Sequence, residues 1–396
     1  MSTENNLKTL YENSIKILSD LIAFKTISGE DNNQLIDYCD EILKKLGATS
    51  FKTFDENKKR VNLFATLKAK KPNGKAPIIL SGHTDVVPVS KGWATNQFEA
   101  VIKKDKLYGR GSCDMKGFIA CTLAYAPIFS KSYLNRDIHF SFTFDEETAC
   151  KGAPILIEEL KKRGIKNGIC IIGEPTNMKI IDAHKGCYNY TTYFEGLAGH
   201  SSAPHKGVSA VEYAAKYVNK LIELREKLKE RTPKESIFDP PHSTLQVGGV
   251  FGGIAHNVIA DKCYVDWETR PVVKEDGIFL NNELDKYANE VLLPEMKKVF
   301  PNSSIKKEII GEIIGFNRVS KSIACEFVSS ITGDNSREVV SFGTEAGLFQ
   351  EIGLSTVVCG PGSIEQAHKI DEFIKLDELK KCINFLEGVK NKSINN

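Results

Sequence analysis

Histidines and acidic residues recur just after four short apolar runs of the sequence, which begin at positions 78, 138, 169 and 356. The residues in these positions are His83, Asp85, Glu146, Glu147, Glu174 and His368. A further acidic residue, Asp114, follows the glycine-rich turn 109–113. Two imidazoles and several carboxylates offer the mixed nitrogen and oxygen donors that suit Zn²⁺ and related metals. If the fold brings these side chains to one rim, the sequence predicts a metal centre.

Each of these residues alone also has an ordinary explanation, because a histidine or a Glu-Glu pair after a strand is usually a polar loop residue. Their combination favours chemistry. Asp85 is close enough to His83 in the sequence to accept the second N–H of the imidazole and so fix its tautomer. The adjacent Glu146 and Glu147 point in different directions at a strand end, so one can bind a metal while the other acts as a base. A nucleotide enzyme is disfavoured, because the glycine-rich segment 109–116 lacks the phosphate-loop pattern.

The elements that would position these residues alternate between helices and short buried strands. Apolar residues recur at helical spacing in the segments 7–24, 35–46, 118–129, 154–162 and 320–332. The four apolar runs between them are typical of strands that are buried on both faces. This alternation predicts an α/β fold, a mixed sheet covered by helices, and ligands bind such sheets outside the carboxyl ends of the strands.

The middle of the chain has a different pattern. From Cys187 we expect a strand, a long helix over 208–230, two strands near 243–250 and 262–270, a second helix to about residue 300, and a last strand near 305–310. This β-α-β-β-α-β order is typical of a two-layer, ferredoxin-like module with its own core. Because α/β elements resume after it, we expect residues 187–312 to be a domain inserted into a catalytic domain formed by 1–186 and 313–396.

Composition excludes several classes of protein. The 396 residues are enough for two domains, and 41% hydrophobic with 26% charged residues is an ordinary globular mixture. Lys and Arg total 53 against 51 Asp and Glu, so we expect neither a nucleic-acid nor an anionic-lipid partner. The ten cysteines form no C-x-x-C pair, which favours reduced, buried thiols in a cytoplasmic protein. The first residues lack the basic and apolar segments typical of a secretory signal, and about 18 apolar residues never run together, so we expect neither export nor membrane spanning.

Four strings of the sequence resemble the dinuclear zinc peptidases and deacylases of the M20 family. They are Ser81–Pro88, Gly109–Gly117, Asp145–Glu147 and Gly173–Thr176. Their order and spacing match throughout, so the resemblance covers essentially the whole chain.

The resemblance implies that Asp114 bridges two metal ions. His83 and Glu174 would complete one site, and Glu147 and His368 would complete the other. Independently, two ions about 3.5–4 Å apart need a shared carboxylate, and a water between them becomes a nucleophile near neutral pH. We therefore expect two Zn²⁺ ions per chain, with Co²⁺ as a plausible substitute.

The resemblance also implies a reaction. Glu146 resembles the general base of the family, which takes a proton from the attacking water and later delivers it to the leaving amine. Asp85, beside the ligand His83, would be the third residue of the catalytic set together with His200. The expected reaction is the hydrolysis of an amide bond in a small N-acylated amino acid.

The inserted module carries further strings that resemble family motifs. Gly196–Ser202 resembles a lid segment whose histidine, here His200, reaches the active site of the partner subunit in family dimers. Segments 252–259 and 268–271 resemble lid motifs that grip the substrate's carboxylate end, with Asn257 and Arg270 as the candidate contacts. Ala260 departs from the pattern, since the family usually has Pro there. The resemblance thus implies a homodimer and a lid or dimerisation role for the module.

Two strings, 342–350 and 359–368, look like the acetylornithine deacetylase branch of the family. Related desuccinylases of diaminopimelate synthesis usually have Ser-Asp after the residue that corresponds to Thr344. Here Glu345 follows and could meet the side-chain ammonium of ornithine. Two alternatives stay open: another M20-type deacylase or dipeptidase, and a binding protein that has lost catalysis. The second is disfavoured, because every inferred ligand and Glu146 are present.

Overall fold

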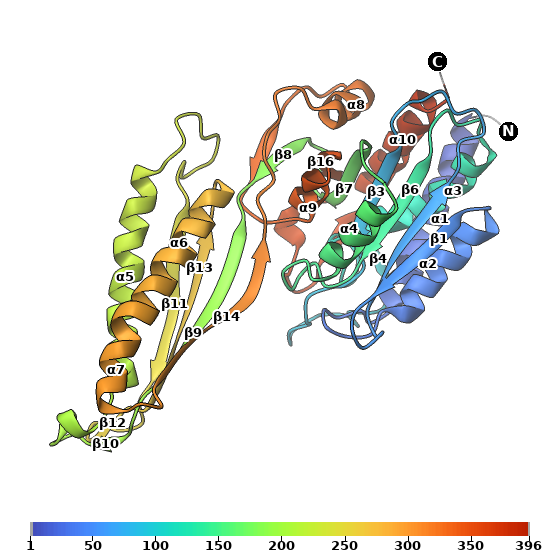
Figure 1. The fold of residues 1–396 in the computed structure, drawn as a ribbon. Coiled ribbons are helices and arrows are strands. Elements are labelled where there is room, and N and C mark those ends of the chain that lie inside the picture. The colour runs from blue at the N-terminus through green and yellow to red at the C-terminus, as the bar shows by residue number, and fades with distance from the viewer. Residues whose placement is uncertain (1–2, 395–396) are drawn as a thin grey trace. The chain divides into compact units, whose positions relative to one another are not determined.

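The computed structural model describes residues 3–394, which fall into two compact units (Figure 1). The first unit contains the chain up to Asp182, the segment Arg318–Glu338 and the chain from Thr344 onward. The second unit contains Ala183–Asn317 and Val339–Gly343. The first unit is therefore formed by chain segments that precede and follow most of the second unit in the sequence.

A mixed sheet of eight strands contains six strands that lie wholly in the first unit, and two strands, β8 and β15, that cross the boundary between the units along the chain. The strands are β1 (Thr49–Phe54), β2 (Val61–Leu67), β3 (Ile78–His83), β6 (Ile138–Thr143), β7 (Ile169–Pro175), β8 (Ile181–His184), β15 (Glu338–Val340) and β16 (Ser355–Gly360). Their order in the sheet is β1-β2-β6-β3-β7-β16-β8-β15. Strand β3 is parallel to both β6 and β7, and β7 is parallel to β16, whereas β2 is antiparallel to β1 and β6. Every residue of β3, β6 and β7 is buried, as expected of strands covered on both faces.

Helices cover this sheet. They are α1 (Thr3–Ala23), α2 (Asn33–Lys45), α3 (Lys116–Lys131), α4 (Gly152–Lys162), α8 (Ile323–Thr332), α9 (Ala346–Glu351) and α10 (Leu376–Lys392). Helix α3 packs against α1, α2 and α10, while α4 packs against α9. A small sheet of β4 (Val101–Lys103), β5 (Lys106–Tyr108) and β17 (Phe373–Lys375) lies beside them in the order β17-β5-β4. The predicted helix-covered mixed sheet is confirmed.

The second unit is a four-stranded antiparallel sheet with its own core. Its strands are β9 (Cys187–Glu195), β11 (Thr244–Gly252), β13 (Lys262–Arg270) and β14 (Ser304–Ile313), in the order β11-β13-β9-β14. Its helices are α5 (Ala210–Glu230), α6 (Lys274–Lys286), the π-helix Tyr287–Leu292 and α7 (Leu293–Val299). A short pair, β10 (Gly199–His200) with β12 (Val258–Ile259), completes the unit. Tyr190 and Trp267 stack in the core, with ring centroids 4.3 Å apart.

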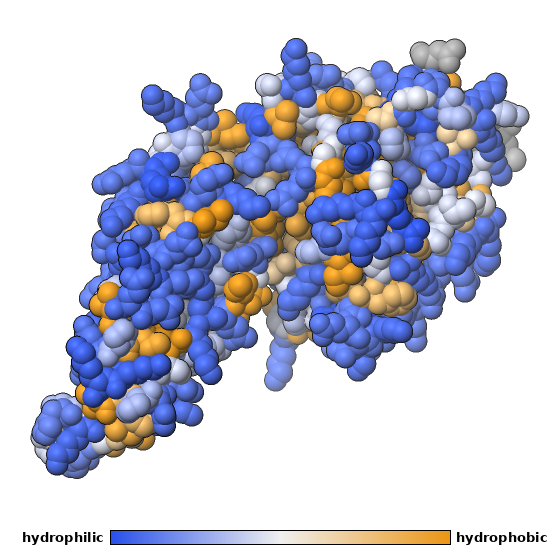
Figure 2. Space-filling model, viewed as in Figure 1, coloured by the Kyte–Doolittle hydropathy of each residue, from blue (hydrophilic) through white to orange (hydrophobic). Residues whose placement is uncertain are grey.

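The surface of the molecule is shown by hydropathy in Figure 2. The face drawn in Figure 2 is mostly hydrophilic, with smaller groups of hydrophobic residues among the polar ones. In the described part of the chain, no helix combines the length and the apolar character needed to cross a membrane.

Candidate active site

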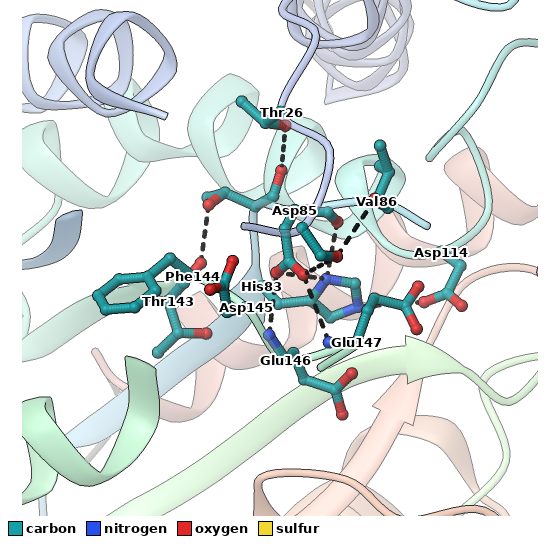
Figure 3. Close-up of polar contacts among 12 residues, drawn as sticks. Thr26, His83, Asp85, Val86, Asp114, Thr143, Phe144, Asp145, Glu146 and Glu147 are labelled. Atoms are coloured by element: carbon teal, nitrogen blue, oxygen red, sulfur yellow. Dashed lines mark hydrogen bonds and ion pairs between the residues drawn. The ribbon is translucent and has the colours of Figure 1, made fainter. Parts of the chain in front are cut away.

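The predicted metal ligands lie at the carboxyl end of the parallel strands of the first unit. His83 is the last residue of β3, Glu174 lies near the end of β7, and Glu147 follows β6. Asp114 directly precedes Met115, which caps α3, and His368 lies in the loop before β17. Because neighbouring parallel strands end at one edge of the sheet, these loops meet there. Figure 3 shows His83, Asp114 and Glu147 pointing toward one another.

The carboxylate of Asp114 lies between two imidazoles. Its Oδ1 is 3.1 Å from Nε2 of His83, and its Oδ2 is 3.4 Å from Nε2 of His368. The same nitrogen of His368 is 2.9 Å from Oε2 of Glu147, and that of His83 is 3.8 Å from Oε1 of Glu174. The carboxylate of Asp114 thus lies beside two separate pairs of possible ligands, His83 with Glu174 and His368 with Glu147.

The possible ligand atoms form two overlapping groups. Atoms of His83, Asp114 and Glu147 lie within 4.8 Å of one another, and so do atoms of His83, Glu146 and Glu174. Glu146, whose sequence motif implies a base and not a ligand, therefore lies within the same cluster. Both groups are compact enough to hold a metal ion.

The electrostatics of this cluster fit bound cations. Burial raises the pKa of Glu146 well above its usual range, and repulsion by the carboxylate of Glu174 raises it further. Burial also raises the pKa of Glu174 well above its usual range; His83 acts to lower it, whereas Asp114 and Glu147 act to raise it. Burial also raises the pKa of Glu147 to about 7. Oε1 of Glu174 is buried and has no hydrogen-bond partner in the described structure. Carboxylates outnumber imidazoles here, so divalent cations would offset the excess negative charge and satisfy that orphaned oxygen.

Protons compete with metal ions for the possible ligand atoms of this cluster. Hydrogen bonds with Asp114 and Glu147 raise the pKa of His368 to about 10. Burial acts to lower the pKa of His83, but the neighbouring Glu174 and Asp114 raise it well above its usual value. Burial acts to raise the pKa of Asp114, but both histidines hold it well below the usual range. Metal ligation requires neutral imidazoles and ionised carboxylates, so binding a metal would release protons.

Asp85 lies beside His83 with both its backbone carbonyl and its carboxylate. Nδ1 of His83 is 3.0 Å from the backbone carbonyl oxygen of Asp85 and 3.5 Å from its carboxylate, so the backbone is the nearer acceptor. The carboxylate also accepts hydrogen bonds from the backbone N–H groups of Glu146 (3.1 Å) and Glu147 (3.3 Å) and from the hydroxyl of Ser28 (2.6 Å) (Figure 3). Asp85 therefore holds the backbone that carries both glutamates.

Other contacts in this loop were not foreseen. Asp145 adopts a left-handed conformation (φ 52°), and its carboxylate accepts hydrogen bonds from the backbone N–H of Gly29 (2.7 Å) and from the guanidinium of Arg60. The thiol of Cys150 is 3.7 Å from Oε1 of Glu146. These three contacts restrain the segment that carries Glu146. The sequence holds no signal for them, because they depend on how the loop turns.

Glu345 directly precedes α9 and is buried. Its Oε2 accepts a hydrogen bond of 2.9 Å from the hydroxyl of Thr143, while its Oε1 is buried without a partner in the described structure. Burial raises the pKa of Glu345 to about 7.

The remaining candidate residues belong to the second unit. His200 in β10 is exposed, and its Nδ1 is 2.7 Å from the hydroxyl oxygen of Ser202. Asn257 is exposed in the loop before β12. The guanidinium of Arg270 contacts Glu268 (3.3 Å) and donates to the backbone carbonyl of Ser341 (2.9 Å).

Known proteins resemble this chain over nearly its full length. An acetylornithine deacetylase of Erwinia tasmaniensis is 34% identical over 391 residues, which is 97% of this chain and 98% of that protein. One of Photorhabdus laumondii is 34% identical over 91% of this chain and 92% of its own length. The crystal structure of the aminopeptidase PepT from Bacillus cereus matches with a TM-score of 0.74 at 20% identity, over 97% of this chain and 99% of that one. That likeness shows a shared fold.

The family can be assigned on independent grounds. The model of peptidase family M20/M25/M40 matches residues 79–391, a stretch that includes every residue of the clustered carboxylates and imidazoles. The four strings that suggested this family contain His83, Asp114, Glu147 and Glu174, and they lie at the ends of β3 and β7, in the loop after β6 and at the start of α3. Sequence, fold and site agree, and the chain belongs to peptidase family M20/M25/M40.

Proposed function

We propose that this chain is a dinuclear metal-dependent amidohydrolase that converts N-acetylornithine and water to ornithine and acetate. The observation that carries the proposal is the carboxylate of Asp114 between the imidazoles of His83 and His368, in a chain whose full-length relatives are named acetylornithine deacetylase.

Two sets of residues would hold the metals. His83, Asp114 and Glu174 would bind one ion, and Asp114, Glu147 and His368 the other. Two bound Zn²⁺ ions, or Co²⁺ in their place, would lower the pKa of a water molecule between them and polarise the amide carbonyl. The nitrogen and oxygen donors of these five residues suit either ion.

The protein's own residues would move the proton. Glu146 lies in the cluster, and its pKa is raised well above the usual value. The carboxylate of Glu146 would therefore accept a proton near neutral pH and later return it. Asp85 would keep Glu146 and Glu147 apart in their two roles, because it binds the backbone N–H of each.

The substrate would be held at its charged ends. The buried, unpaired Oε1 of Glu345 supports the proposal that a cationic side chain is recognised near this position. Arg270 and Asn257 are the proposed contacts of the substrate's carboxylate. His200 is proposed to stabilise the oxyanion in the site of a partner subunit, within a homodimer.

The cellular setting also belongs to this proposal. All ten cysteines are buried and free, which supports a reducing compartment such as the cytoplasm.

A substrate panel tests the function. The metal-loaded chain is assayed with N-acetylornithine, N-succinyl-diaminopimelate, N-acetyl derivatives of neutral amino acids, and dipeptides. We expect the highest kcat/KM for N-acetylornithine, and a Glu345→Gln variant to lose more activity on it than on a neutral acetyl amino acid. A higher kcat/KM for the succinylated substrate or for a dipeptide would assign the chain to another branch of the family.

A further inference from the structure

Glu372 is a buried carboxylate, 1% exposed, that binds the loop carrying Asp114. Its Oε1 accepts hydrogen bonds from the backbone N–H groups of Cys113 (2.9 Å) and Asp114 (3.1 Å). Its Oε2 accepts from the backbone N–H of Gly111 (3.0 Å) and from the guanidinium of Arg110 (2.9 Å). Each oxygen therefore serves two donors.

Only an ionised carboxylate meets all these donors. It accepts at both oxygens and donates nothing, whereas an amide presents N–H groups on one side. The three backbone N–H groups belong to a buried turn in which Gly111 has a φ of 78°, and an unpaired buried N–H is costly. The carboxylate of Glu372 thus fixes the backbone conformation that places Asp114.

The same residue is tied to the loop of His368. Glu372 lies four positions after His368, and its backbone carbonyl accepts a hydrogen bond from Gly109 (3.0 Å). Directly after it, Phe373 in β17 pairs with Tyr108 in β5.

The short loop between the two residues has little freedom. His368 and Asp371 both have a positive φ, of 61° and 55°. The carboxylate of Asp371 accepts a hydrogen bond of 2.9 Å from the backbone N–H of Ala94. A change at Glu372 would therefore shift His368 as well as Asp114.

We propose that Glu372 is a positioning residue for the metal centre. It holds the bridging carboxylate of Asp114 and the imidazole of His368 in the positions that metal binding requires. This inference rests on the ligand roles given under the proposed function. It does not depend on the identity of the substrate.

Titration of the metal-free chain with Co²⁺ tests it, by calorimetry and by the visible absorption spectrum of the bound ion. We expect two ions per wild-type chain. Glu372→Gln keeps the size of the side chain but turns N–H groups toward donors, so we expect an affinity about 10–100-fold weaker and a changed spectrum. Glu372→Asp keeps the charge and should recover part of the affinity.

Glu378→Gln is the matched control. Glu378 is also buried and accepts a backbone N–H, from Gly362 (3.0 Å), together with the ammonium of Lys381 (2.7 Å). This variant should bind Co²⁺ as the wild type does, which separates positioning from a general loss of stability. If Glu372→Gln does not fold, Glu372→Asp decides: an affinity and a spectrum equal to wild type overturn the inference.

The outcomes also separate this inference from the proposed function. A wild-type chain that takes up no Co²⁺ contradicts the metal sites themselves. A wild-type chain that binds two ions, with a Glu372→Gln variant of equal affinity and unchanged spectrum, overturns only the role of Glu372.

Discussion

At the scale of single residues, Asp114 presents one carboxylate oxygen to each of two imidazoles. If it bridges two ions, Asp114→Ala removes a ligand from both at once. We therefore expect the purified variant to lose both metals together, as measured by elemental analysis after dialysis. Asp40→Ala, which removes a buried aspartate of α2 that binds Lys44 and Ser50, serves as the control and should retain them. Two tightly bound ions in the Asp114 variant would show that this carboxylate does not bridge.

Glu146 and Glu147 can be told apart by a second substitution. Glu146→Ala should keep both metals and lower kcat by about 10²–10⁴-fold, because it removes proton transfer and no proposed ligand. Metal content and turnover are measured on the same preparation. Because Glu146 lies within 4.8 Å of possible ligand atoms of His83 and Glu174, loss of metal with activity would reverse the assignment of base and ligand between the two glutamates.

Sequence reasoning could identify the residues that cluster but not the contacts that hold them. Strand ends and spacing pointed to His83, Asp114 and His368, and these do lie together. Glu372 escaped notice because its partners are backbone N–H groups about 260 positions earlier, and no residue pattern encodes such a contact. The carboxylate of Asp85 was expected to meet an imidazole, and it lies 3.5 Å from Nδ1 of His83, but the backbone carbonyl of Asp85, which no residue pattern indicated, lies closer at 3.0 Å.

At the scale of elements, the close approach of β7 to α3 positions Glu174. A Cβ added at Gly173 would lie 2.0 Å from Cγ of Phe118, which is fully buried. Gly173→Ala should therefore destabilise the chain by about 1–3 kcal/mol and weaken metal binding through the neighbouring Glu174. Denaturant unfolding and Co²⁺ titration measure the two effects.

Gly248 in β11 provides the comparison for that prediction. A Cβ there would lie 3.5 Å from its nearest neighbour, the carbonyl oxygen of Asp266, which is ordinary contact. Gly248→Ala should change stability much less than Gly173→Ala. Equal unfolding midpoints for the two variants would mean that α3 yields to the added methyl group, and that the packing does not restrain β7.

Some strands and helices could be predicted from the sequence and others could not. The buried strands β3, β6, β7 and β16 were visible as apolar runs. Strand β2 is equally buried but contains Asn62 and Thr66, whose side chains bond to Gly152 and His139, and such pairing cannot be read from one segment. The strands β4, β5 and β17 have three residues each, too few for a periodic pattern. Helix α10 was missed although its buried residues Leu379, Cys382, Ile383 and Leu386 recur at helical spacing.

At the scale of the whole molecule, the proposed ligands lie on both sides of the second unit in the chain. His83, Asp114, Glu147 and Glu174 precede residues 183–317, and His368 follows them. A bound metal would therefore link two segments of the first unit that are far apart in the sequence. We expect removal of the metals by a chelator to lower the unfolding temperature, since ligand at 100 times its Kd stabilises by about 2.7 kcal/mol per site. Restored metal should reverse the change; an unfolding temperature that is insensitive to chelation would contradict this coupling.

The last prediction concerns assembly. His200 is exposed in β10 of the second unit, whereas Glu146 and the proposed ligands belong to the first. If the chain forms a homodimer in which His200 serves the partner's site, two inactive variants can complement each other. His200→Ala and Glu146→Ala chains are unfolded and refolded together. Each mixed dimer then has one site with both residues intact and one site that lacks both.

Random pairing makes about half of the dimers mixed, so roughly a quarter of wild-type activity is expected if the sites act independently. Each variant refolded alone is the control and should stay nearly inactive. The proportion of mixed dimers is measured by mass spectrometry of differently tagged chains. Activity that never exceeds the two controls, despite confirmed mixed dimers, would mean that His200 acts within its own chain or outside catalysis. A gain that follows the fraction of mixed dimers, in contrast, requires that a histidine of one chain stabilise the reaction at the site of the other.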